Sequence, residues 1–66
     1  MGMTRAEEIA KQFLKAYTDK GQAFEQARDN AIIALVAANA FMDDQEDKFD
    51  LIGAAYYLKS LVYYKG

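Results

Sequence analysis

The absence of proline is the sequence feature that most limits what this chain can fold into. The 66 residues contain no proline and four glycines, at positions 2, 21, 53 and 66. Proline breaks a helix because it lacks a backbone N–H, and glycine weakens a helix because it adds backbone freedom. With so few helix breakers, we expect an all-α chain. The length allows one domain, residues 1–66.

Glycine and polar clusters divide the chain into three predicted helices, at residues 4–20, 22–42 and 47–64. Thr4 and Glu7 have the spacing of a capping box, which starts a helix. Gly21 suits the left-handed position that ends one. Residues 43–46 form the second connection. These features predict a small three-helix unit with short connections, in which the second helix is central.

The segment 31–38 is apolar on every side of the predicted second helix. A helix that is hydrophobic all round is buried all round. Two neighbouring helices of the same chain would leave part of this surface uncovered. We therefore expect the chain to complete its core as a homo-oligomer, most simply a two-fold dimer. The residues predicted for that interface are Ile32, Ile33, Val36, Asn39 and Ala40.

Asn39 interrupts this apolar half of the second helix and allows two interpretations. A single asparagine in a seam between helices can fix the register and the oligomeric state. Alternatively, Asn39 faces water near the end of the helix, because the apolar periodicity places it at the edge of the stripe. The sequence favours neither.

Two apolar lines run along the predicted third helix. The line with a seven-residue rhythm is expected to face the core, and it comprises Leu51, Ala54, Ala55, Leu58, Leu61 and Val62. A second line lies beside it and comprises Phe49, Ile52, Tyr56 and Tyr63.

Tyrosines gather on the third helix in two adjacent pairs, seven residues apart. Tyrosine combines an apolar ring with a polar tip and is common at protein interfaces. The rings could instead stack on a small planar ligand such as a nucleotide, with Lys59 holding its anionic group. Nucleic acid fits less well, because stacking modules normally add a basic groove. The predicted partner or ligand surface is Tyr56, Tyr57, Lys59, Tyr63 and Tyr64.

The acidic segment 43–50 lacks the alternating acids, the central glycine and the final glutamate of an EF-hand loop. A solvated turn followed by acids at a helix N-terminus accounts for it. We therefore expect no metal site and no cofactor. A role for these acids in attracting a partner stays open.

The chain contains no histidine and no cysteine, and it carries no phosphate-binding loop or nucleophile elbow. We therefore expect no enzyme. A helix-turn-helix nucleic-acid binder is a weak alternative, because the third helix begins with acids that phosphate would repel. The net charge of −2 also differs from that of a basic binder.

The expected function is that of a protein–protein interaction or oligomerisation module with an unknown protein partner. A chain this short obtains little stability from one core, and its 53% apolar content suits helix packing or oligomerisation. The alternative is a sponge or sensor for a small planar anionic ligand. We expect a cytoplasmic protein without a signal sequence or membrane span. Its general character suits a small bacterial or phage accessory protein.

Overall fold

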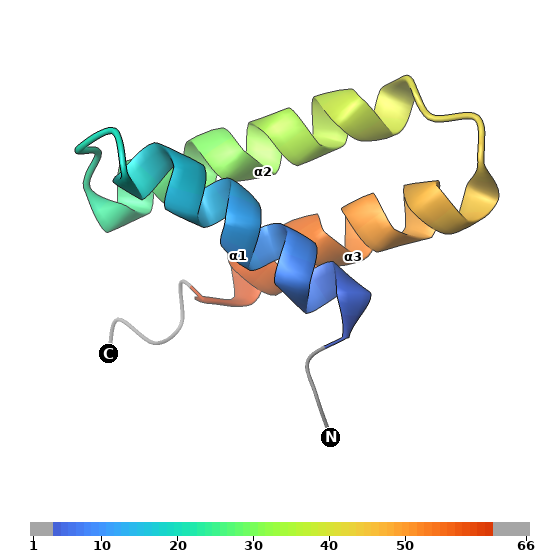
Figure 1. Cartoon of the computed structure of the whole chain (residues 1–66), viewed down its shortest axis with the longest axis horizontal. Helices are drawn as coiled ribbons and strands as arrows, with labels where there is room; N and C mark the ends of the chain where they lie inside the picture. Colours follow the sequence, from blue (N-terminus) through green and yellow to red (C-terminus); the bar gives the residue numbers. More distant parts are fainter. Residues whose placement is uncertain (1–3, 62–66) are drawn as a thin grey trace.

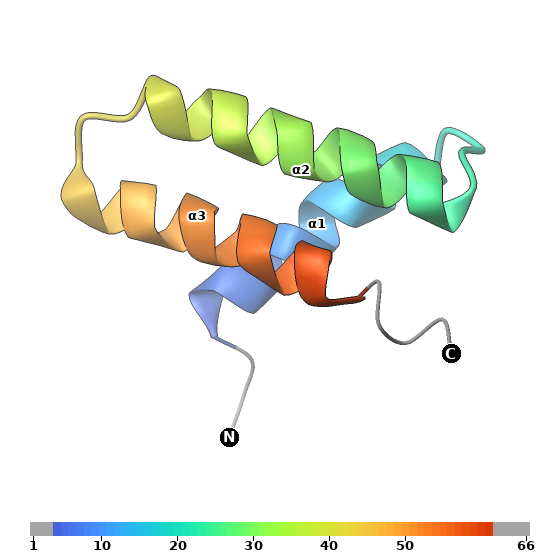
Figure 2. The same cartoon turned by 180° about the vertical axis from the view of Figure 1, so that it is seen from behind.

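The computed structural model describes residues 4–61 and contains three helices. They are α1 (Arg5–Thr18), α2 (Phe24–Ala40) and α3 (Gln45–Ser60). The predicted small all-α three-helix unit is thus confirmed. Helices α2 and α3 run antiparallel, and α1 crosses one side of this pair (Figures 1 and 2). Each helix packs against the other two.

The predicted capping box at the start of α1 is confirmed. The backbone N–H of Glu7 donates to Thr4 Oγ1 at 3.2 Å, and the N–H of Thr4 donates to Glu7 Oε1 at 3.3 Å. The helix ends at Thr18, two residues before the predicted end, because residues 19–21 form a tight turn. Gly21 has a φ of +93°, the left-handed conformation expected of it.

The boundaries of the other two helices differ from the prediction by about one turn or less. Helix α2 begins at Phe24 and ends at Ala40. Helix α3 begins at Gln45, two residues early, because the Asp44 side chain accepts a hydrogen bond of 3.1 Å from the N–H of Glu46. Asp44 is therefore the N-cap of α3. The predicted residues 62–64 of this helix lie outside the described part of the chain.

Small side chains dominate the core between the three helices. Among residues 4–61, the large side chains that are fully buried are Leu35 of α2 and Leu58 of α3. Alanines from all three helices fill the space around them. Larger side chains pack against this centre while remaining partly exposed: Ile9, Phe13, Leu14, Tyr17, Ile32, Leu51, Tyr57 and Leu61. The predicted core line of α3 is confirmed through Leu61, and Val62 lies outside the described residues.

Helices α1 and α3 approach closely at a pair of small residues. A Cβ atom built on Gly53 would lie 3.2 Å from the Cβ of Ala6. One turn away, Arg5 Nε lies 3.0 Å from Asp50 Oδ2. The missing side chain of Gly53 therefore helps to set where α1 crosses α3, and so which face of α3 it covers.

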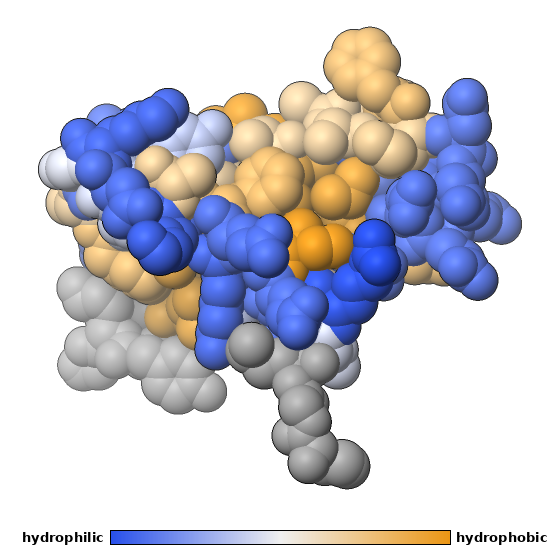
Figure 3. Space-filling view, viewed as in Figure 1, coloured by the Kyte–Doolittle hydropathy of each residue, from blue (hydrophilic) through white to orange (hydrophobic). Residues whose placement is uncertain are grey.

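On the side of the molecule that carries α1, hydrophilic residues lie at both ends and across the lower middle, around an apolar area in the centre and upper part of the view (Figure 3). In the view from behind, α2 and α3 lie in front of α1 (Figure 2). Within residues 4–61, no helix is both long enough and apolar enough to cross a membrane.

Candidate interaction groove

The aliphatic side chains of α2 divide into covered and uncovered ones. Leu35 is fully buried, and Ile32 packs against the core. Ile33 is 65% exposed and Val36 is 52% exposed, although both lie in the middle of the helix. The two neighbouring helices therefore shield only part of the all-round apolar surface, as the sequence predicted. Exposed aliphatic side chains that lie next to each other commonly mark a site of interaction.

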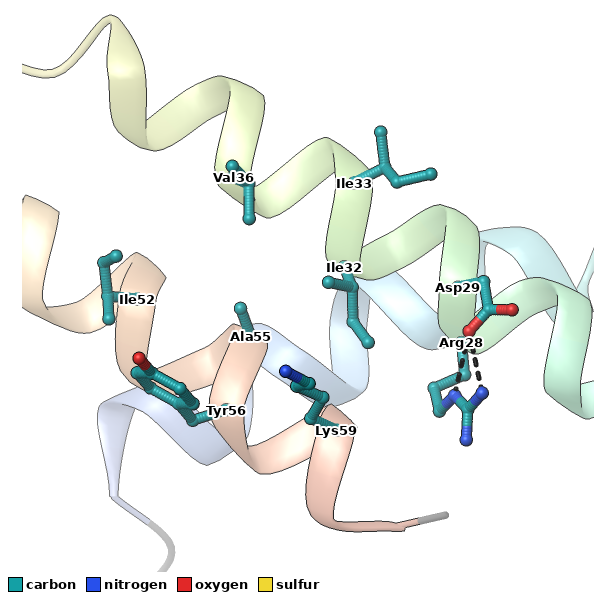
Figure 4. Close-up of a pocket in the computed structure, with 9 residues that line it drawn as sticks. All are labelled: Arg28, Asp29, Ile32, Ile33, Val36, Ile52, Ala55, Tyr56 and Lys59. Carbon is teal, nitrogen blue, oxygen red and sulfur yellow. Dashed lines mark hydrogen bonds and ion pairs between the residues drawn. The ribbon is translucent and has the colours of Figure 1, made fainter.

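These two side chains line an open groove between α2 and α3, with a volume of about 700 Å³ (Figure 4). We call it the α2–α3 groove. Among the described residues, its lining comes from α2 and α3, and α1 contributes none. The lining residues are Arg28, Asp29, Ile32, Ile33, Val36, Ile52, Ala55, Tyr56 and Lys59.

An ion pair lies at one end of the groove. Arg28 Nη2 lies 2.7 Å and Arg28 Nε 3.2 Å from Asp29 Oδ1. The Arg28 side chain is only 12% exposed, and its Nη1 has no hydrogen-bond partner among residues 4–61. Lys59 lines the groove from α3, and its ammonium group points toward the middle of the groove (Figure 4). The charged side chains that line the apolar groove are therefore two cations and one carboxylate.

The predicted tyrosine surface is divided by the fold. Tyr56 and Lys59 line the α2–α3 groove, and Tyr56 is 67% exposed. Tyr57 instead packs against the hydrophobic core. Tyr63 and Tyr64 lie outside the described residues. Of the predicted partner or ligand surface, the structure therefore brings Tyr56 and Lys59 together.

The predicted oligomer interface is mostly at or beside the groove. Ile32, Ile33 and Val36 line it, and Ala40 is exposed one turn beyond Val36. Asn39 is half-buried, and its Oδ1 is buried without a hydrogen-bond partner among the described residues. Asn39 therefore does not simply face water, although it lies near the end of α2.

The amphipathic pattern in the first half of α2 predicts that Arg28 faces outward, and the structure corrects this, because its side chain is largely buried. Arg28 lies seven residues before Leu35, which is two helical turns and hence the same face. That spacing could have placed it beside the core. Asp29 and Ile52 were also not recognised as groove residues, because they become neighbours only when α2 and α3 pair.

A smaller hollow of about 230 Å³ lies between α1 and the start of α3. Asp47 and the ion-paired residues Arg5 and Asp50 line it together with apolar side chains. Within the described part of the chain, no group of three or more histidine, cysteine or acidic residues is placed to hold a metal ion. The acids of segment 43–50 thus do not converge on one point.

Comparison of the chain with protein-family models, with curated protein sequences and with solved structures finds no match.

Proposed function

We propose that this protein is a non-catalytic helical interaction module that self-associates through the α2–α3 groove. The observation that carries this proposal is the exposure of Ile33 and Val36 in the middle of α2, beside Ile52 and Tyr56 of α3. Covering a large aliphatic side chain contributes roughly 1.5–3 kcal/mol. A second helix laid in an apolar groove is a common way to cover such residues.

The composition of the groove supports a protein occupant. Its centre is aliphatic, one tyrosine borders it, and its charged residues lie toward one end. Protein interfaces likewise have an apolar, aromatic centre and a polar rim. The chain also lacks histidine and cysteine, the most versatile catalytic side chains.

Sedimentation of the wild-type protein across micromolar concentrations tests this proposal. We expect a species heavier than the 7.4 kDa monomer, in reversible equilibrium with it. Circular dichroism on the same samples establishes that the chain is helical. A folded chain that sediments as a monomer at every concentration would contradict self-association.

A second candidate function is the binding of a small planar anionic ligand, such as a nucleotide. Tyr56, Lys59 and Arg28 line one groove, whose volume lies within the range of ligand pockets. However, Asp29 lies in the same groove and neutralises Arg28 at 2.7 Å, which weakens the attraction for an anion.

A thermal-shift screen with nucleotides separates the two candidates. A ligand that binds only the folded state raises the melting temperature with its concentration. Binding in the groove predicts that Tyr56→Ala and Lys59→Ala abolish this rise. Unchanged melting temperatures for the wild type would eliminate the ligand candidate and leave self-association in place.

A further inference from the structure

Two exposed stripes border the α2–α3 groove. The α2 stripe consists of Asp29, Ile33, Val36 and Ala40, and the α3 stripe consists of Phe49, Ile52, Tyr56 and Lys59. Successive members are three or four residues apart, and this spacing keeps side chains on one side of a helix. Since the helices run antiparallel, Asp29 and Lys59 mark one end of the groove (Figure 4).

The steps between members of the α2 stripe are four, three and four residues, whether they are read from Asp29 to Ala40 or from Ala40 to Asp29. Two copies of α2 packed antiparallel can therefore match their stripes along the whole length. Ile33 then lies opposite Val36 of the second copy, and Asp29 lies opposite Ala40 of the second copy. A two-fold interface has this reciprocal form, because residue i contacts residue j and j contacts i.

The two ends of the groove differ in charge. Residues 43–50, beyond the Ala40 end, contain five carboxylates and one lysine. At the opposite end, Arg28 and Lys59 line the groove with a single carboxylate, that of Asp29. Glu25, exposed one turn before Asp29 on α2, adds a second carboxylate at this end, and at the acidic end Arg5 pairs with Asp50. The molecule is therefore acidic beyond one end of the groove and close to neutral at the other.

This charge difference selects between two ways of bringing two such faces together. If the two-fold axis is parallel to the helices, the acidic end of one copy lies over the acidic end of the other, and α2 lies over α3 of the second copy. If the axis is perpendicular to the helices and lies between the two faces, the acidic end of one copy lies over the Arg28 and Lys59 end of the other, and α2 lies over α2 of the second copy. Like charge opposes the first arrangement, which brings the acidic ends together. The second arrangement avoids this repulsion, because it places each acidic end over the nearly neutral end that carries Arg28 and Lys59.

We propose that a second copy of this chain covers the α2–α3 groove face to face in an antiparallel two-fold arrangement, with α2 over α2 and its acidic segment 43–50 over the Arg28 and Lys59 end. This inference rests on the proposed function, since it specifies the partner and the orientation at the same groove. It also assigns a role in partner orientation to the acidic segment, which the fold of a single chain leaves largely in solvent.

Single cysteines test the orientation directly, because the chain has no cysteine of its own. Asp29→Cys and Ala40→Cys introduce thiols at the two ends of the α2 stripe. These positions are about 16 Å apart along a helix, whereas a disulfide needs Cα atoms within about 7 Å. We expect an equal mixture of the two variants to form a disulfide dimer under mild oxidation, and each variant alone to stay largely uncrosslinked.

Two further samples make every outcome decisive. Asp29→Cys mixed with Lys59→Cys should crosslink only if α2 lies over α3 of the second copy. Ala16→Cys, at an exposed position on α1, controls for random collision. A wild type that sediments as a dimer but gives any other crosslinking pattern, or none, overturns the antiparallel arrangement and leaves the proposed function standing. A wild type that sediments only as a monomer overturns both.

Discussion

Replacing Ile33 with lysine separates self-association from folding. The Ile33 side chain is 65% exposed, so its loss removes little from the core of the single chain. Lysine at this position lies four residues after Asp29, and an acid followed by lysine at this spacing stabilises a helix by about 0.2–0.5 kcal/mol. Lysine also forms helices slightly better than isoleucine. The monomer of Ile33→Lys is therefore expected to fold.

The cost to the dimer follows from the same exposure. Full burial of an isoleucine contributes roughly 1.5–3 kcal/mol, so covering the exposed 65% of Ile33 contributes about 1–2 kcal/mol per copy. A two-fold interface contains this residue twice, which makes roughly 2–4 kcal/mol per dimer. Because about 1.4 kcal/mol is a tenfold change, the dissociation constant should rise by about 30- to 700-fold.

Sedimentation equilibrium of wild type and variant measures this change, and far-ultraviolet circular dichroism checks that both are helical. Ala16→Lys is the matched control, since it places the same side chain at an exposed position on α1, away from the groove. It should leave the dissociation constant unchanged. If Ile33→Lys and the control associate equally well, Ile33 lies outside the interface and the reasoning is refuted.

Three other perturbations test the packing. Gly53→Leu should lower the free energy of unfolding by roughly 1–3 kcal/mol in urea denaturation, because its side chain would push into Ala6; an unchanged value would contradict the close approach of α1 and α3. Asn39→Leu should raise the free energy of unfolding by about 1 kcal/mol, because it removes a buried oxygen without a partner among the described residues. A decrease would indicate that Asn39 makes a stabilising hydrogen bond, as in a seam between helices. The melting temperature of the wild type should increase with protein concentration in scanning calorimetry, and a constant value would argue against linked dimerisation.

The helices could be predicted from the sequence because their signals are local. The capping box at Thr4 and the left-handed Gly21 each depend on a few neighbouring residues, and both are confirmed. The start of α3 was predicted two residues late, because Asp44 was assigned to the connection after α2. Its side chain caps the following helix instead. An aspartate between two helices can serve either one, and periodicity does not distinguish them.

The groove was harder to predict because it depends on where α1 crosses the α2–α3 pair. The sequence predicted that α2 would be left partly uncovered and placed Ile33 and Val36 among the interface residues, and both are exposed. The described members of the second apolar line of α3, Phe49, Ile52 and Tyr56, are also exposed, although their pattern would equally suit a buried face. Which line α1 covers depends on its close approach to Gly53, and this contact between distant residues has no periodic signature.

The core is small and the groove is open for the same reason: small apolar side chains fill the centre of the molecule, and many of the large ones lie on its surface. The fully buried centre of residues 4–61 consists mainly of alanines around Leu35 and Leu58. Larger apolar side chains lie instead on the surface, and the most exposed are Ile33, Val36, Phe41, Phe49 and Tyr56. A chain of this length obtains only about 3–5 kcal/mol from its own core. Covering the groove would add a comparable amount, so self-association should stabilise the folded chain through apolar surface that its own core leaves uncovered.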